Sequence, residues 1–250
     1  MTAFKTKIAT ADATSITVRG LDLVSDIIGE MSFTELQYFL CTSRRPTAQQ
    51  VKVLDACLVT LMEHGWTPSS IIARMMIDSV PEESQVAIAS GLLAMGSVFA
   101  GTAEGCAKIL QEGIAAGGDL DAYCDKVVAE HRQARKPLAG FGHPLHKPDD
   151  PRSIKLFAVG RAAGLEGKYL DLLERLGKSM DKAAGKHISI NATGVLGALL
   201  LEIGLEPGVM RGLAVVSRAG GLIGHITEER ETHTARHIWH LAEEHIPYEK

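Results

Sequence analysis

The sequence has 250 residues, of which 46% are hydrophobic and only 5% aromatic, and its 26 basic and 30 acidic side chains give a formal charge of -4. This composition excludes a disordered chain, and the length is sufficient to bury a core without disulfide or metal cross-links. The absence of a basic run indicates that nucleic acid is not a partner. With so few aromatic rings, small aliphatic side chains must fill the core, so we expect an all-α protein rather than a β-sandwich.

The cysteines and the apolar segments indicate the cellular compartment of the protein. The four cysteines show neither a C-x-x-C pair nor zinc-binding spacing, so we expect buried free thiols at Cys41, Cys57, Cys106 and Cys124. Residues 1–10 lack the apolar stretch of a signal peptide. The longest apolar run, residues 194–201, is far shorter than the ~20 residues that a membrane helix needs. These features predict a cytoplasmic protein with no membrane partner.

Start signals and apolar periodicity predict helices along most of the chain. A short extended segment at residues 16–20 leads into a first helix, which carries the apolar residues between 23 and 28. Capping-box spacing at residues 32–35 opens a second helix. Further helices are expected at 46–65, from 68 onward, and at 81–95, 101–110, 119–135, 152–163, 165–180, 192–203 and 209–226.

One segment interrupts the predicted helices, and two of the predicted helices are unusually apolar. The stretch from Gly140 to Pro151 holds two glycines and three prolines, so it cannot be helical throughout and we expect a fixed loop. Residues 192–203 and 209–226 are almost wholly apolar. Both should therefore lie inside the protein or at a subunit interface.

Two groups of polar residues in the first two thirds of the chain have functional potential. In Glu63-His64-Gly65 the histidine has the chemistry to donate to a bound carbonyl or carboxylate; the alternative is a cation that interacts with a helix dipole. Residues 140–143, Gly-Phe-Gly-His, precede Arg152 by nine residues or more, so glycines that admit a ligand are combined with a guanidinium that can hold a carboxylate. The alternative there is a structural turn with an exposed histidine.

Two more groups lie toward the C-terminus. Residues 186–191, Lys-His-Ile-Ser-Ile-Asn, precede a buried helix whose N-terminus can receive an anion; the alternative is that Asn191 only caps that helix. The last group combines arginines and histidines, a set that suits a ligand with several carboxylates: Arg218, His225, Arg230, His233, Arg236, His237 and His240.

A metal site is not expected in this last group. His233 and His237 have the i, i+4 separation of metal ligands, but the H-E-x-x-H pattern is absent. Arg230 and Arg236 would also repel a cation. We therefore predict no metal.

Together, these stretches resemble the citrate synthase superfamily, and among its members the citryl-CoA lyases and the citryl-CoA lyase module of ATP-citrate lyase. The resemblance is carried by V-R-G with S-F-T-E-L, by G-F-G-H with D-P-R, and by S-R-A-G-G-L-I-G-H, at residues 18–20, 32–36, 140–143, 150–152 and 217–225. It implies a citrate-synthase-like all-α fold for residues 1–250, with a small helical subdomain at about 103–190 inserted in a large one. It also implies a homodimer.

The resemblance implies roles for individual residues as well. His64 and His143 would bind the carbonyl or hydroxyl end of a citrate-like ligand, and Arg152 and Arg218 would clamp its carboxylates. Arg236 resembles the arginine that this family contributes to the site of the neighbouring subunit.

Coenzyme A enters through the same resemblance. Lys147 and Lys186 fall where the family places basic contacts to the phosphates of coenzyme A. The thioester would be a substrate, together with a di- or tricarboxylate, and no tightly bound cofactor is expected.

Two positions depart from the family pattern. Phe99 stands in the substrate site where synthases have a histidine for the enolate oxygen, a loss shared by the lyase module. Thr193 stands where the family has its catalytic aspartate, and a threonine hydroxyl is a poor acid or base near neutral pH. The residues with suitable chemistry to replace the aspartate are Glu63, Glu104, His146 and His187.

The sequence therefore predicts a CoA-dependent carbon–carbon lyase that cleaves citryl-CoA or a related 3-hydroxyacyl-CoA by a retro-aldol step. His143 would polarise or deprotonate the tertiary hydroxyl, and the products would be an acyl-CoA and a 2-oxo acid. One alternative is a condensing enzyme of the citrate synthase type. The other, favoured by Thr193, is a non-catalytic homologue that binds coenzyme A or a tricarboxylate.

Overall fold

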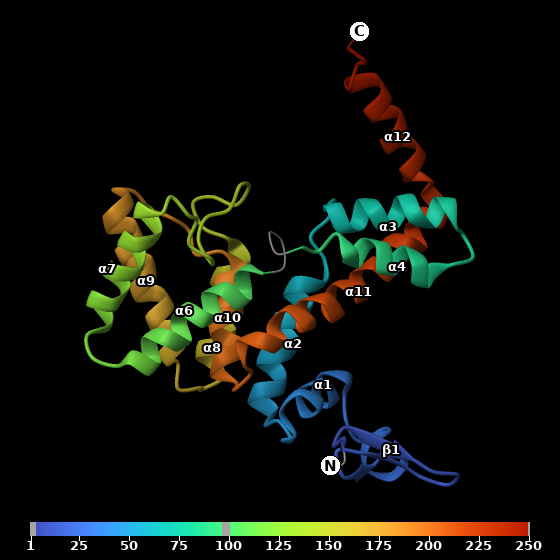
Figure 1. The fold of residues 1–250 in the computed structure, drawn as a ribbon, viewed down its shortest axis with the longest axis horizontal. Coiled ribbons are helices and arrows are strands. Elements are labelled where there is room, and N and C mark those ends of the chain that lie inside the picture. The colour runs from blue at the N-terminus through green and yellow to red at the C-terminus, as the bar shows by residue number, and fades with distance from the viewer. Residues whose placement is uncertain (1–3, 97–100, 250) are drawn as a thin grey trace.

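The computed structural model describes residues 4–96 and 101–249, which fold into a helical protein with one small sheet (Figure 1). The sheet is antiparallel in the order β1-β2-β3 and is followed by a π-helical turn, η1. The bounds of these elements are β1 Ala9–Ala11, β2 Ile16–Val18, β3 Leu21–Asp22 and η1 Leu23–Ile27. The described helices are α1 Phe33–Thr42, α2 Ala48–Met62, α3 Pro68–Ser79, α4 Ser84–Leu93, α6 Thr102–Ala116, α7 Leu120–Gln133, α8 Pro151–Ala162, α9 Lys168–Ala184, α10 Ala192–Glu202, α11 Pro207–Thr232 and α12 Thr234–His245.

Local side chains set where several helices begin. The capping box predicted at residues 32–35 is present, since Ser32 accepts from the backbone of Glu35 and the Glu35 carboxylate accepts from the backbone of Ser32. The helix expected from residue 165 begins instead at Lys168, because Gly164 and Gly167 have φ of 66° and 82°, outside the helical region. The helix expected at 209–226 is longer and runs through a polar segment to Thr232.

The described residues bury two groups of hydrophobic side chains. The larger group is centred on α10, which is buried from Val195 to Leu201 and contacts α6, α8 and α9. At Gly197 a Cβ would lie 2.7 Å from the carbonyl oxygen of Ala103, so α10 and α6 cross at backbone contact. The smaller group joins α3, α4 and the C-terminal half of α11 through residues such as Ile77 and Leu222. The expectation that residues 192–203 lie in the interior is confirmed.

The two groups of helices lie side by side in Figure 1, with α6 to α10 in one half and α3, α4 and much of α11 in the other. Helices α2 and α11 pack against each other where the halves meet. Helix α12 extends away from the rest of the chain and contacts α3 near its base. The all-α class is confirmed, whereas the subdomain boundary at 103–190 and the homodimer stay predictions.

The structure also bears on the expectations about the cysteines and about membrane-spanning helices. All four cysteines are free thiols; Cys57, Cys106 and Cys124 are buried, while Cys41 is half-buried. Burial raises the pKa of the Cys106 thiol to about 12. Within the described ranges, the helices are too short or too polar to cross a lipid bilayer.

Candidate active site

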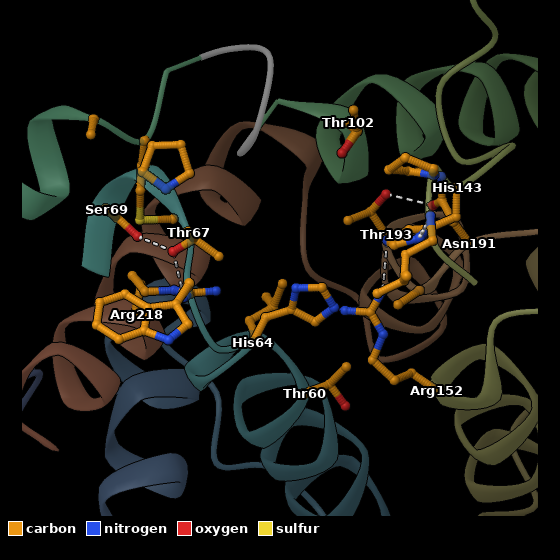
Figure 2. A pocket seen from close by; sticks show the side chains of 18 of the residues that line it. Thr60, His64, Thr67, Ser69, Thr102, His143, Arg152, Asn191, Thr193 and Arg218 are labelled. Atoms are coloured by element: carbon orange, nitrogen blue, oxygen red, sulfur yellow. Dashed lines mark hydrogen bonds between the residues drawn. The ribbon is translucent and has the colours of Figure 1, made fainter. Parts of the chain in front are cut away.

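A cavity of about 530 Å³ opens between the two halves of the molecule. Its walls come from the end of α2, the start of α3, the loop at 142–145, the first turns of α8 and α10, and the middle of α11. In Figure 2, His64 stands between a group around Arg218 and a group around Arg152 and His143. Residues that the sequence places 154 positions apart therefore face one another across a single space.

His64 follows directly after the last turn of α2. The Glu63 carboxylate accepts a hydrogen bond from the backbone N–H of His64 at 2.8 Å and lies 3.0 Å from His225 Nε2, which fixes this turn. Burial lowers the pKa of His64, and the nearby charges of Arg152, His146 and Arg218 lower it further. The imidazole is therefore held in its neutral form near neutral pH.

His143 is oriented by the backbone of its own loop. Its Nδ1 accepts hydrogen bonds from the backbone N–H groups of Leu145 at 3.1 Å and His146 at 3.0 Å. Because a neutral imidazole has one hydrogen, this assignment leaves the hydrogen on Nε2, where His143 can donate to a ligand oxygen. Burial, then His146 and Arg152, lower the pKa of His143 as well.

The loop that carries His143 is anchored to the start of α10. Gly142 donates to Ser189 at 2.8 Å, and the Asn191 side chain donates to the carbonyl of Gly142 at 2.9 Å. Gly140 has a φ of 90°, and a Cβ on Gly194 would lie only 2.6 Å from the Gly140 carbonyl oxygen. The two glycines thus allow a backbone contact that places His143 beside the N-terminus of α10.

Arg152 is positioned by a buried carboxylate. Asp150 is fully buried and accepts from Arg152 Nε at 3.0 Å, from Arg152 Nη2 at 2.7 Å and from the backbone N–H of Ala192 at 3.1 Å. Although burial opposes ionisation, these hydrogen bonds lower the pKa of Asp150 to about 2. The guanidinium keeps Nη1 for a ligand, and its Nη2 lies 3.4 Å from His143 Nε2.

Arg218 is the cation with the fewest partners in this cavity. Its Nε is buried and has no hydrogen-bond partner among residues 4–96 and 101–249, and its Nη1 lies 3.5 Å from the Thr67 hydroxyl. Burial lowers the pKa of Arg218, an effect that the charge of Glu63 opposes. A poorly paired guanidinium that lines a cavity is arranged to receive an anion.

Thr193 lies in the first turn of α10, at the cavity wall. Its hydroxyl donates to Asn191 Oδ1 at 2.7 Å, and the same oxygen accepts from the backbone of Gly194. The hydroxyl is thus engaged by the side chain that caps the helix, Asn191. The capping role predicted as one alternative for Asn191 is confirmed, whereas the other alternative, an anion bound at the N-terminus of α10, stays a prediction.

The other predicted residues lie elsewhere. Lys147 and Lys186 are exposed and are not in the cavity wall. Arg236 projects from α12, with Nε 3.2 Å from the carboxylate of Asp78. Phe99 lies outside the described residues.

Of the four residues with chemistry to replace the missing aspartate, three are engaged by other groups. Glu104 pairs with Lys108 at 2.7 Å, and Glu63 pairs with His225. His187 lies between Asp181 and Asp149, and hydrogen bonds to both carboxylates raise its pKa. Only His146, among these four in the described structure, contacts the imidazole rings of His64 and His143: its ring stacks on that of His143 with centroids 4.4 Å apart.

His64, His143 and His146 offer nitrogens within 4.8 Å of one another, which is a spacing that could hold a metal ion. Two features oppose ligation. The Nδ1 of His143 accepts hydrogen bonds from two backbone N–H groups. In a metal-bound histidine, the ring nitrogen that does not bind the metal carries a hydrogen and donates it to a partner. Arg152 places a positive charge 3.4 Å from the remaining nitrogen of His143. Both features disfavour a metal ion held by these three side chains.

Several lining residues gave no signal in the sequence. Thr60, Trp66, Thr67 and Ser69 reach the cavity from segments with no functional motif, and Thr102 follows Phe99 by three residues but was not itself predicted. Trp66 lies 4.8 Å from the Arg74 guanidinium, which holds the indole by a cation–π contact. Proximity to His64 along the chain was the one available indication for Trp66 and Thr67.

The fold and this cavity define a class of protein. The family model described as "Citrate synthase, C-terminal domain" matches residues 43–240, so the chain belongs to that family. Among curated proteins, it is 26% identical over 196 residues to a citrate synthase of Synechocystis, covering 76% of this chain and 48% of that protein. A probable ATP-citrate synthase of Caenorhabditis elegans is 21% identical over 257 residues, covering 95% of this chain and 23% of that protein. The chain thus spans half or less of the length of these relatives.

Solved structures refine the comparison. The citryl-CoA lyase from Hydrogenobacter thermophilus has a TM-score of 0.83 and 29% identity, covering 92% of this chain and 88% of that one. The ATP citrate lyase of Methanothrix soehngenii in complex with citrate and coenzyme A has a TM-score of 0.80 and 19% identity, covering 92% of this chain and 39% of that one. A ternary complex of citrate synthase from Thermoplasma acidophilum has a TM-score of 0.68 and 21% identity, with coverage of 82% and 57%. The relatives are enzymes of the citrate synthase superfamily.

Proposed function

We propose that the chain is a CoA-dependent carbon–carbon lyase that cleaves citryl-CoA, or a related 3-hydroxyacyl-CoA, into an acyl-CoA and a 2-oxo acid. The observation that carries this proposal is the convergence of His64, His143, Arg152 and Arg218 on one cavity. Two fixed cations with two neutral imidazoles between them match a ligand that combines carboxylates with one reacting hydroxyl or carbonyl group.

The two arginines would bind different carboxylates of this ligand. Arg152 is held by Asp150 with Nη1 left over, and Arg218 has a buried, unpartnered Nε within the described residues. Since each guanidinium is already oriented before a ligand arrives, little conformational entropy is lost on binding. The hydroxyl-bearing carbon would then lie beside His143.

His143 would act on the reacting oxygen. Its Nε2–H donates to the tertiary hydroxyl oxygen, which becomes the carbonyl oxygen of the 2-oxo acid. The electrons of the broken carbon–carbon bond pass to the thioester carbonyl as an enolate, and the hydroxyl proton ends on the enolate carbon. No outside reductant or proton is consumed in this step.

Two observations favour a lyase over a condensing enzyme. Phe99 stands where synthases have a histidine for the enolate oxygen, a loss that resembles the lyase module. Thr193, whose hydroxyl is engaged with Asn191, removes the family's catalytic aspartate from both directions of the reaction and does not discriminate between them. The structure of the Hydrogenobacter thermophilus citryl-CoA lyase also matches more of its own length, 88%, than the citrate synthase of Thermoplasma acidophilum, 57%. Lys147 and Lys186 would contact the phosphates of coenzyme A as exposed cations in the segments that precede α8 and α10.

The same Thr193 favours a second candidate, a non-catalytic protein that binds coenzyme A or a tricarboxylate. The cations of the cavity suffice for binding, whereas proton transfer needs a further group. Replacement Thr193→Asp separates the candidates, because it would increase turnover in a weakened enzyme and leave a binding protein without activity.

The direct test is release of oxaloacetate and acetyl-CoA from citryl-CoA by the purified full chain. We expect turnover that Arg152→Met reduces strongly. The matched control is Arg161→Met on the same helix, where the arginine pairs with Asp171 and Glu174 away from the cavity, and which should leave turnover unchanged. If coenzyme A and citrate raise the melting temperature while neither product forms, before and after Thr193→Asp, the binding candidate replaces the lyase.

A further inference from the structure

The ring of His146 is in contact with the ring of His64. The Nε2 atoms of the two rings lie 3.3 Å apart, within hydrogen-bond distance, although the residues are 82 positions apart in the chain. Two imidazole nitrogens in such contact share one hydrogen, so one ring donates and the other accepts. The stack between His143 and His146, with ring planes 24° apart, holds the His146 ring in place for this contact.

The other nitrogen of His64 is free to act on a ligand. His64 lines the cavity, and its Nδ1 makes no hydrogen bond to the residues that the structure describes. The Nδ1 of His64 is thus available to a substrate, while its Nε2 is in contact with His146. This arrangement can pass a proton without moving either ring.

We infer that His146 is a positioning residue that stores the substrate's hydroxyl proton, which reaches it through His64. The inference rests on the proposed lyase reaction, in which His143 donates to the hydroxyl oxygen and therefore cannot accept its proton, and in which the aspartate that would return a proton to the acyl carbon is missing. Among the four candidates in the described structure, His146 is the one whose ring contacts the imidazoles of His64 and His143, whereas Glu63, Glu104 and His187 are paired with other side chains.

The proton transfer conserves hydrogen atoms and charge. The hydroxyl O–H bond breaks and a bond forms between that hydrogen and His64 Nδ1, while the hydrogen of His64 Nε2 passes to His146 Nε2. His146 becomes a cation, and the contact between the rings becomes a stronger, charge-assisted hydrogen bond. After the carbon–carbon bond breaks, the reverse transfer returns one hydrogen to the enolate carbon, so both rings end neutral.

The activity test uses two variants of one residue. His146→Ala should lower kcat by about 10²–10⁴-fold, the usual loss for a proton-transfer group, while the Kd for oxaloacetate stays unchanged. Added imidazole should restore part of that kcat in His146→Ala. His146→Phe keeps a ring for the stack but should stay inactive with or without imidazole. His131→Gln, on α7 and bonded to its own helix at Val127, is the control that should keep wild-type kcat.

Two outcomes would overturn the inference. Wild-type kcat in His146→Phe would show that stacking on His143 is the whole role of this ring. Loss of kcat in His146→Ala without any recovery in imidazole, in a folded protein with normal oxaloacetate affinity, would show that no proton passes through this position.

A measurement independent of turnover separates this inference from the lyase proposal. Nitrogen-15 spectra of histidine-labelled protein report which ring nitrogen carries hydrogen. We expect His64 to carry hydrogen on Nε2 and His146 to have a free Nε2. A His64 ring with hydrogen on Nδ1 would overturn the inference even in an active lyase. If citryl-CoA is not cleaved at all, the lyase proposal fails and these spectra alone decide whether the pair is arranged to transfer a proton.

Discussion

Replacement Asp150→Asn tests how the substrate arginine is held in place. Asp150 is fully buried, caps α8 and accepts four hydrogen bonds, three from Arg152 and one from the backbone of Ala192. Asparagine would keep the shape but turn an NH₂ group toward these donors. The substitution therefore removes a buried charge while its partner charge remains.

The magnitude follows from the pKa of this carboxyl group. A pKa lowered from 3.8 to about 2 corresponds to roughly 2 kcal/mol of stability, at ~1.36 kcal/mol per pKa unit. The side chain of Arg152 is 28% exposed and keeps some hydration, so the loss should be about 2–3 kcal/mol, below the ~3–5 kcal/mol for breaking a fully buried pair.

The assay is urea unfolding at pH 7 and at steps down to pH 2. Because the folded-state pKa is depressed, the contribution of Asp150 is fully present above the unfolded value near 3.8 and is lost as pH falls toward 2. The wild-type and variant curves should therefore converge in acid. Asp121→Asn is the control, since Asp121 makes the same 2.7 Å contact with Arg175 on the surface and should contribute about 1 kcal/mol or less.

One result would refute this reasoning. If Asp150→Asn unfolds at the same urea concentration as Asp121→Asn, then the buried carboxylate does not hold Arg152, and the preorganisation argued for that guanidinium is wrong.

Further predictions concern binding, protonation and close packing. Arg218→Met should weaken citrate binding by roughly 10- to 150-fold, as loss of a ~1.5–3 kcal/mol charged hydrogen bond implies, without lowering the melting temperature of the free protein; calorimetry of both quantities checks this. The pKa of His64, measured by NMR, should lie below 6.5 because of burial and neighbouring cations, and Arg152→Ala should move it upward. A pKa that falls in this variant would contradict that reading. Gly194→Ala should destabilise the fold by about 1–3 kcal/mol through the clash with the opposite loop, whereas Gly208→Ala, where a Cβ meets open space, should be neutral or slightly stabilising in urea unfolding.

Much of the site could be predicted from motifs whose parts lie close together in the chain. Asp150 and Arg152 are two residues apart at a helix start, so the same sequence that caps α8 also orients the arginine. The capping box at Ser32 is local in the same way, since its two hydrogen bonds close within four residues. Such features need little knowledge of the rest of the fold.

Contacts between distant segments could not be predicted. The pairing of His64 with His146 depends on how the loop after Gly140 packs against α10, which in turn depends on two glycines 54 positions apart. The sequence identified His146 only as one of several groups with suitable chemistry. Its distinction from Glu104 and His187 came from the tertiary partners that engage those side chains.

The length of α11 has a mechanical consequence for Arg218. The helix has 26 residues, about 39 Å at 1.5 Å per residue, and Arg218 lies near its midpoint. One turn away, Gly221 packs against the backbone of Met62 with no room for a Cβ, which makes this turn a fulcrum. A tilt of about 5° around Gly221 would displace the far end, where α12 begins, by about 1.4 Å, and the backbone at Arg218 by about 0.4 Å. A movement of the projecting C-terminal helix would therefore reach the backbone of Arg218 at about a quarter of its size.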